Sequence, residues 1–223
     1  MSALRRGPAA PVDHDRLRLD ELASISELAH TLSIEQWDHP SLCEGWLVRD
    51  VISHMCLGYT MSVPMTLVKI ARRRFDVAAA SRDESIAFGH THTPAEILEV
   101  FDPIWRNGIR HGISRLIKPS EGLVDHVIHH QDLRRPLGLP REIPADRLVA
   151  ALDVLPGLGG FVGAARRCDG LRLVALDVEW SAGDGPEVRG RGEAILLAGS
   201  GRSVALGELE GDGVDVLRSR LAA

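Results

Sequence analysis

Eight residues, Asp125-His-Val-Ile-His-His-Gln-Asp132, constrain the fold most, because they combine three histidines and two carboxylates with the apolar spacing of a buried helix. Each residue of a helix turns by about 100°, so Asp125, His129 and Asp132 fall within about 60° of arc. A solvated helix separates its ionisable and apolar faces, whereas apolar residues flank this polar stripe on both sides. A buried carboxylate beside an imidazole needs a partner, and a divalent metal fits best.

Bulk composition excludes several classes of protein. The 223 residues suffice for one large domain or two modest ones. The net charge of -5 argues against a nucleic-acid partner, and no apolar run reaches the roughly 18 residues of a membrane span. No apolar signal segment follows the basic N-terminal residues, and the three scattered cysteines suit a reducing compartment. We therefore expect a cytoplasmic protein without membrane or nucleic-acid partners, as a monomer or homodimer.

Helical spacing of apolar residues predicts an antiparallel bundle of four helices over residues 13–142. Thr93-Pro-Ala-Glu96 has the form of a capping box with proline in the first turn, and Ser120 is the expected cap of the last helix. Residues 76–92 are polar and are predicted to form a long connection. The four expected helices cover residues 13–32, 47 to the low seventies with a bend at Pro64, 93–116 and 120–135.

The pattern changes after residue 142 and predicts a small α+β unit over residues 143–223. Ala145–Arg167 has helical spacing but four glycines, so two helical pieces are expected. The later elements are strands at 171–180 and 187–189 and helices at 194–198 and 214–221. The predicted fold class is thus α+β, with a helical bundle first.

Candidate metal ligands come from two helices. A catalytic zinc site uses about three protein ligands and leaves one position open. Asp125 and His129 supply two of them, and His54, on an otherwise uncharged helix face, is the third. The alternative is a hydrogen bond between His129 and Asp125 without any metal. His126 and His130 lie about 100° and 140° round the helix from Asp125 and are predicted to face away from the ligands, at the surface or in a supporting role.

Asp132 is the candidate catalytic residue, because it is the one further group near the ligands that could act as a general acid or base. It could instead orient a ligand histidine, as carboxylates around metal sites commonly do. A surface ion pair with Arg134 or Arg135 is the third possibility. Cys43 could approach the site from its loop, although a buried, inert thiol is the preferred interpretation.

The segment Trp37-Asp-His-Pro-Ser-Leu-Cys-Glu-Gly-Trp-Leu-Val-Arg-Asp-Val-Ile-Ser-His54 resembles the signature of the mycothiol-dependent maleylpyruvate isomerase family, within the DinB-like superfamily. The family's second motif, an acidic residue followed by His and Asp, is matched by Asp125, His129 and Asp132. Trp180 and the segment 185–190 resemble the family's C-terminal domain, which is similar in shape to sterol-carrier proteins.

This resemblance implies a four-helix bundle that holds a divalent metal, commonly zinc, through His54, Asp125 and His129, and mycothiol as a cosubstrate. The isomerases usually carry Glu at the acidic position, where this chain has Asp125. A carboxylate one methylene shorter would hold the metal closer to its helix or through a water.

Two functions agree with these features. In the preferred one, a metal-dependent enzyme lowers the pKa of a small thiol, and the thiolate adds to a small electrophilic substrate. Release after bond rotation would be isomerisation, whereas retention of the adduct would be transfer. The alternative is a non-catalytic module that binds a metal or a small ligand.

Overall fold

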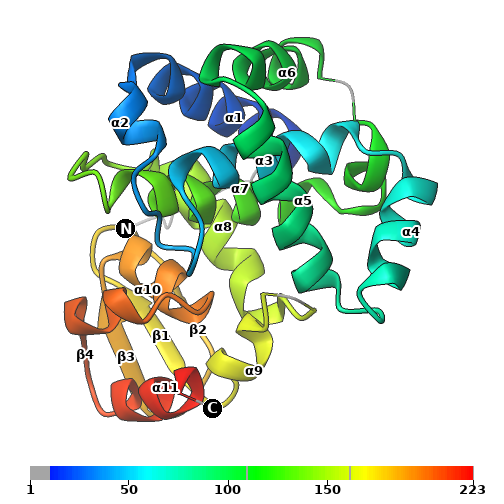
Figure 1. Cartoon of the computed structure of the whole chain (residues 1–223). Helices are drawn as coiled ribbons and strands as arrows, with labels where there is room; N and C mark the ends of the chain where they lie inside the picture. Colours follow the sequence, from blue (N-terminus) through cyan, green and yellow to red (C-terminus); the bar gives the residue numbers. More distant parts are fainter. Residues whose placement is uncertain (1–10, 109, 161, 223) are drawn as a thin grey trace.

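The computed structural model describes residues 11–108, 110–160 and 162–222. Four helices form a bundle in the first part of the chain (Figure 1). Within the bundle, α1 contacts α6 and α7, and α3 contacts the same two helices. The bundle helices are α1 (His14–Thr31), α3 (Val48–Thr60), α6 (Pro94–Asn107) and α7 (Pro119–Arg134), with the short α2 (Ile34–Trp37) between α1 and α3.

Side-chain caps account for where two of these helices begin. The carboxylate of Asp13 accepts a hydrogen bond from the Arg16 amide at 3.0 Å. Thr93 and Glu96 form the expected capping box at the start of α6. That helix ends at Asn107, because Gly108 adopts a left-handed conformation (φ 61°), and Gly112–Leu116 forms a separate 3₁₀ turn (η1). The helix expected to run to 116 is therefore shorter than predicted.

Two further expectations about helix boundaries need correction. The predicted second helix is two helices. The first ends at Thr60, because Met61 has an extended backbone, and the side chain of Ser62 then caps the start of α4 (Val63–Arg72). Pro64 lies in the first turn of α4, where its missing N–H costs no hydrogen bond. The fourth helix begins at Pro119 and not after Ser120.

Residues 77–91 form helix α5 (Val77–Thr91), so the predicted long connection is wrong. Asp76 caps the start of the helix, because its side chain accepts a hydrogen bond from the Ala79 amide at 2.9 Å. Its buried residues are small, and a Cβ on Gly89 would lie 2.6 Å from Oδ1 of Asp50 on α3. Because α5 packs through small residues, a search for periodic large apolar residues does not detect it.

The last part of the chain is a small α+β unit that lies below the bundle in Figure 1. Its four-stranded sheet has the order β2-β1-β3-β4, in which β1 is parallel to β3 and the other pairs are antiparallel. The elements are α8 (Ala145–Val154), η2 (Leu155–Gly157), α9 (Ala164–Cys168), β1 (Arg172–Ala175), β2 (Ser181–Ala182), β3 (Glu187–Gly190), α10 (Gly192–Gly199), η3 (Ser203–Glu208), β4 (Leu209–Glu210) and α11 (Gly213–Leu221).

The α+β class is confirmed as a mostly helical fold with one small sheet. The expected strand at 171–180 is a hairpin, since Ala175 bonds back to Trp180 before β2 begins. Helix α7 contributes to both hydrophobic clusters: Leu123 and Val127 pack with the C-terminal unit, whereas Leu133 packs with α1, α3 and α6. Of the helices in the described ranges, none is long and apolar enough to cross a membrane.

Candidate metal centre

The three predicted ligands converge, although they come from two helices. His54 lies on α3, and Asp125 and His129 lie one turn apart on α7. One potential ligand atom from each of the three residues lies within 4.8 Å of the other two. Two imidazoles and one carboxylate form a donor set that suits zinc and leaves a coordination position open. The residues present therefore fit a divalent metal.

The orientation of His129 is set by carboxylates on both sides of its ring. Its Nδ1 lies 2.9 Å from Oδ2 of Asp132, and its Nε2 lies 3.5 Å from Oδ1 of Asp125. With Nδ1 engaged by Asp132, Nε2 is the nitrogen that faces the other ligands. Carboxylates that fix a ligand histidine in this way raise its basicity and hold its tautomer.

His54 is held by a residue that the sequence did not single out. Its Nδ1 lies 3.0 Å from the hydroxyl oxygen of Ser81, on α5. The His54 ring packs against Trp46 and His129 at centroid distances of 5.4 and 5.1 Å. When Nδ1–H of His54 donates to the Ser81 oxygen, the lone pair lies on Nε2 and is available to a metal. Ser81 was not predicted as a site residue, because residues 76–92 were expected to form a loop between helices.

The pKa values of the three proposed ligands are shifted in different directions. Burial lowers the pKa of His54 to about 4, and the nearby His129 adds to this effect. Burial acts to raise the pKa of Asp125, but His129, His126 and His54 outweigh it and lower that pKa. Burial likewise opposes the protonation of His129, but Asp125 and the hydrogen bond to Asp132 raise its pKa well above 6.5. His129 is thus the one ligand that must lose a proton before it can bind a metal.

Asp132 is fully buried and pairs with an arginine from the C-terminal unit. Arg202 donates from Nε to Oδ1 at 3.0 Å and from Nη2 to Oδ2 at 2.5 Å. Burial opposes ionisation, but the hydrogen bonds from His129 and Arg202 lower the pKa of Asp132 to about 2. The predicted pair with Arg134 or Arg135 is wrong, because these side chains bond His130 and Glu193 instead. Nothing in the sequence indicated Arg202, which lies 70 residues further along the chain.

Cys43 lies at this site and is only half-buried, whereas a buried, inert thiol was the preferred interpretation of the sequence. Its Sγ is 3.2 Å from Oδ2 of Asp132 and 3.7 Å from Nη2 of Arg202. The half-buried thiol also lines a cavity of about 420 Å³ between the two parts of the molecule. The other lining residues are Leu42, Glu44, Gly201, Arg202, Ser203 and Val204. The cavity therefore opens beside the side chains that support His129.

His126 and His130 are buried, which corrects the prediction of a surface position for them. His126 is 4% exposed, and its Nε2 lies 2.9 Å from the Tyr59 hydroxyl. His130 is fully enclosed, with Nδ1 2.8 Å from Glu21 and Nε2 accepting from Arg134. Helix α7 contacts α1, α3 and α8, so it lacks the solvated face that the prediction assumed.

Comparisons with known proteins find one matching domain family and two structures of similar fold. Residues 18–107 match the family model described as the mycothiol maleylpyruvate isomerase N-terminal domain, which confirms the resemblance over a segment that includes His54. A crystal structure of the mycothiol-dependent maleylpyruvate isomerase is 17% identical with a TM-score of 0.58, and the match covers 91% of this chain and 93% of that one. A histidine-to-alanine mutant of the isomerase matches at 17% identity over the same shares of the two chains, with a TM-score of 0.56. At this identity the two structures establish a shared fold. No curated protein matches the sequence.

Proposed function

We propose, from the domain match and the site geometry, that the chain is a metal-dependent enzyme that uses a low-molecular-weight thiol. The thiol is mycothiol by family resemblance, and the reaction is isomerisation of, or transfer to, a small electrophilic substrate. One observation carries the proposal: ligand atoms of His54, Asp125 and His129 converge within 4.8 Å. Both histidines engage their Nδ1 atoms elsewhere, with Ser81 and Asp132. Because both Nδ1 atoms are engaged, each imidazole can present Nε2 to a shared metal, and this arrangement favours a metal over a hydrogen-bonded cluster without one.

The proposed metal is zinc, bound by Nε2 of each histidine and by the Asp125 carboxylate. When bound, zinc would lower the pKa of a thiol at the open position, so that the thiol is present as the thiolate at neutral pH. Asp125 is one methylene shorter than the glutamate usual in the isomerases. We propose that the metal consequently lies closer to α7 or is held partly through a water.

We assign Asp132 as a positioning residue. Both of its oxygens are engaged, by His129 and Arg202, and the side chain is fully buried. A substrate therefore cannot contact Asp132 directly, and Asp132 acts on the site through His129 and Arg202. Its role is to hold the proton on Nδ1 of His129 and so keep Nε2 available as a ligand. We propose that the cavity beside Cys43, which Arg202 also lines, is where the small molecules approach the site.

The C-terminal unit is proposed to share the shape of sterol-carrier proteins, since a four-stranded sheet there packs against α10 and α11. We keep 13–142 and 143–223 as the proposed domains, and a monomer or homodimer as the assembly. The free cysteines Cys43, Cys56 and Cys168 support a cytoplasmic location.

Metal analysis of protein purified without an affinity tag tests the ligand assignment. We expect one equivalent of metal in the wild type and none in His54→Ala or His129→Ala. His92→Ala, which changes a partly buried histidine outside the site, is the matched control. Unchanged metal content in the His54 and His129 variants would refute the proposed centre.

Thiol consumption separates an enzyme from a module that only binds. Metal-loaded protein is incubated with mycothiol and a panel of small electrophiles, and free thiol is measured over time. We expect either catalytic loss of thiol or a change in the substrate at constant thiol, in both cases absent from His54→Ala. Stoichiometric metal without turnover of any member of the panel would favour the non-catalytic module.

A further inference from the structure

A second cavity, of about 610 Å³, lies at the junction of α7, the segment 138–142 and the start of α10. This volume falls in the range of about 300–1,000 Å³ that is usual for small-molecule sites. Gln131 follows His129 by two residues, so it points about 200° around the helix from that ligand. The cavity is therefore on the opposite side of α7 from the metal centre. Its lining residues are Gln131, Arg135, Gly138, Leu139, Pro140, Arg141, Glu142, Arg191 and Glu193.

Two buried donors at this cavity lack an acceptor among the described residues. Gln131 is 2% exposed, and its Nε2 has no hydrogen-bond partner among the described residues. Nε of Arg141 is buried and also lacks a partner in the described ranges, although the other two guanidinium nitrogens bond His130 and Glu21. A buried donor without an acceptor costs free energy. Gln131 and Arg141 both line the cavity, so an acceptor group bound there would supply the hydrogen bond that these donors lack among the described residues.

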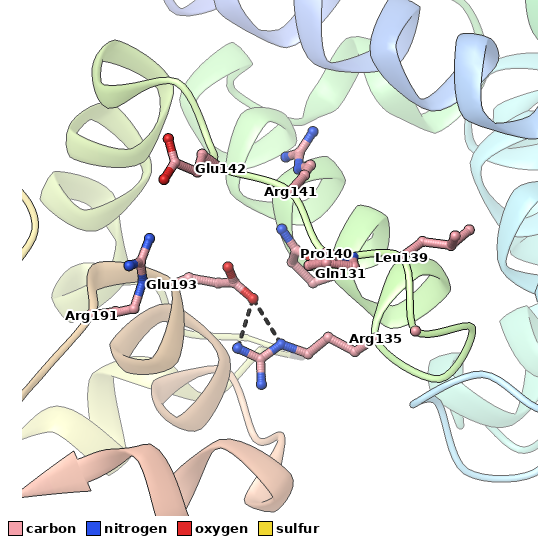
Figure 2. Close-up of a pocket in the computed structure, with 9 residues that line it drawn as sticks. Gln131, Arg135, Leu139, Pro140, Arg141, Glu142, Arg191 and Glu193 are labelled. Atoms are coloured by element: carbon pink, nitrogen blue, oxygen red, sulfur yellow. Dashed lines mark hydrogen bonds and ion pairs between the residues drawn. The ribbon is translucent and has the colours of Figure 1, made fainter.

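The charged side chains around the cavity limit the charge and the polar groups of a ligand that could bind there. Figure 2 shows Glu193 of α10 and the preceding Arg191 on one side, and Gln131 of α7 and Arg135, just after that helix, on the other. Arg135 bonds Glu193 at 2.7 Å across the space. Arg191 pairs with Asp177 through Nε at 3.6 Å, and its side chain is 60% exposed.

We propose that this cavity, defined here as the α7–α10 cavity, binds a small carboxylic acid that also carries a hydroxyl or ammonium group. The terminal amide of Gln131 turns about a soft torsion, so its NH₂ group can face the cavity and donate to the carboxylate. The exposed guanidinium of Arg191 supplies the opposite charge. Glu142 and Glu193 accept from the hydroxyl or ammonium group, and they disfavour ligands with several negative charges.

The proposal is tested on the full metal-loaded protein by calorimetry, with L-lactate and L-alanine as probes and propionate as the analogue without the second polar group. We expect saturable binding of lactate or alanine and at least tenfold weaker binding of propionate. Gln131→Leu removes the donor at nearly constant volume, and Arg191→Leu removes the exposed charge. Each should weaken binding at least tenfold, whereas Arg189→Leu, on β3 outside the cavity, should leave it unchanged.

The controls separate this cavity from the metal centre. Metal content should be the same in the wild type and all three variants, because none of the changed residues contacts His54, Asp125 or His129. Arg191 is exposed, so its variant remains informative if Gln131→Leu folds poorly. Absence of saturable binding by both probes, or wild-type affinity in Gln131→Leu and Arg191→Leu, would overturn the proposal and indicate that only water enters the cavity.

Discussion

His129 and Asp132 lie three residues apart on α7, and the imidazole Nδ1 is 2.9 Å from the carboxylate Oδ2. Arg202, from the C-terminal unit, bonds the same carboxylate. The two parts of the chain therefore meet at a group that orients a proposed metal ligand.

Asp132→Asn should weaken metal binding without removing the ligands. The amide retains an oxygen near Nδ1 but loses the charge that stabilises the proton there and attracts Arg202. We expect a loss of about 10- to 100-fold in metal affinity, which is typical when a supporting carboxylate is changed. Chelator competition measures the affinity, with Asp184→Asn in the exposed turn before β3 as the control. Equal affinities of Asp132→Asn and wild type would contradict the positioning role.

Substitutions of Asp125 test how the site tolerates its short carboxylate. Asp125→Ala removes a charged ligand and should lower metal affinity by more than about a hundredfold, beyond the effect of changing a supporting group. Asp125→Glu restores the residue usual in the isomerases and should keep one equivalent of metal. Metal analysis and chelator competition measure both variants. A stoichiometric metal in Asp125→Ala would show that the carboxylate is not a ligand.

Metal binding at neutral pH should release about one proton. The pKa of His129 lies well above 6.5 in the metal-free protein, whereas that of His54 is about 4 and Asp125 is already ionised. Only His129 therefore gives up a proton, and metal affinity should rise with pH until His129 titrates in the metal-free state. Calorimetry in buffers of different ionisation enthalpy counts the protons. Release of none at pH 7 would show that His129 is neutral before the metal binds.

Spacing suggested the proposed ligands, because Asp125 and His129 are one turn apart and His54 lies on an uncharged helix face, but it left a metal-free hydrogen bond equally open until the family resemblance favoured the metal. The supporting residues could not be found in this way. Ser81 lies on a helix that packs through small residues, and Arg202 comes from the other unit of the chain. Both contacts depend on tertiary packing, for which a single sequence carries no periodic signal.

Tertiary packing also explains why His126 and His130 were wrongly expected at the surface. A helical wheel gives the angle of each residue but not the number of neighbouring helices. Helix α7 packs against α1, α3 and α8, so polar residues at almost every angle are enclosed and must find partners. The hydroxyl of Tyr59 and the carboxylate of Glu21 provide them.

Glu21 should therefore contribute strongly to stability. Its side chain is fully buried and accepts from Arg141 at 2.5 Å and Arg147 at 2.8 Å, with His130 also 2.8 Å away. Glu21→Ala leaves these groups without their carboxylate, and loss of one partner of a buried ion pair typically costs about 3–5 kcal/mol. Urea unfolding of the variant measures the loss. Asp20→Ala, next to it in an exposed pair with Arg16, should cost no more than about 1 kcal/mol.

The pH dependence of unfolding gives Glu21 a second test. Burial acts to raise its pKa, but His130, Arg141 and Arg147 outweigh it and lower the pKa from 4.5 to about 2. Because the folded pKa is the lower one, the stabilisation is complete above 4.5 and is lost as the pH falls towards 2. The difference in free energy of unfolding between wild type and Glu21→Gln should therefore shrink over that range. A difference that stays constant from pH 6 to pH 2.5 would mean that Glu21 is not ionised in the folded protein.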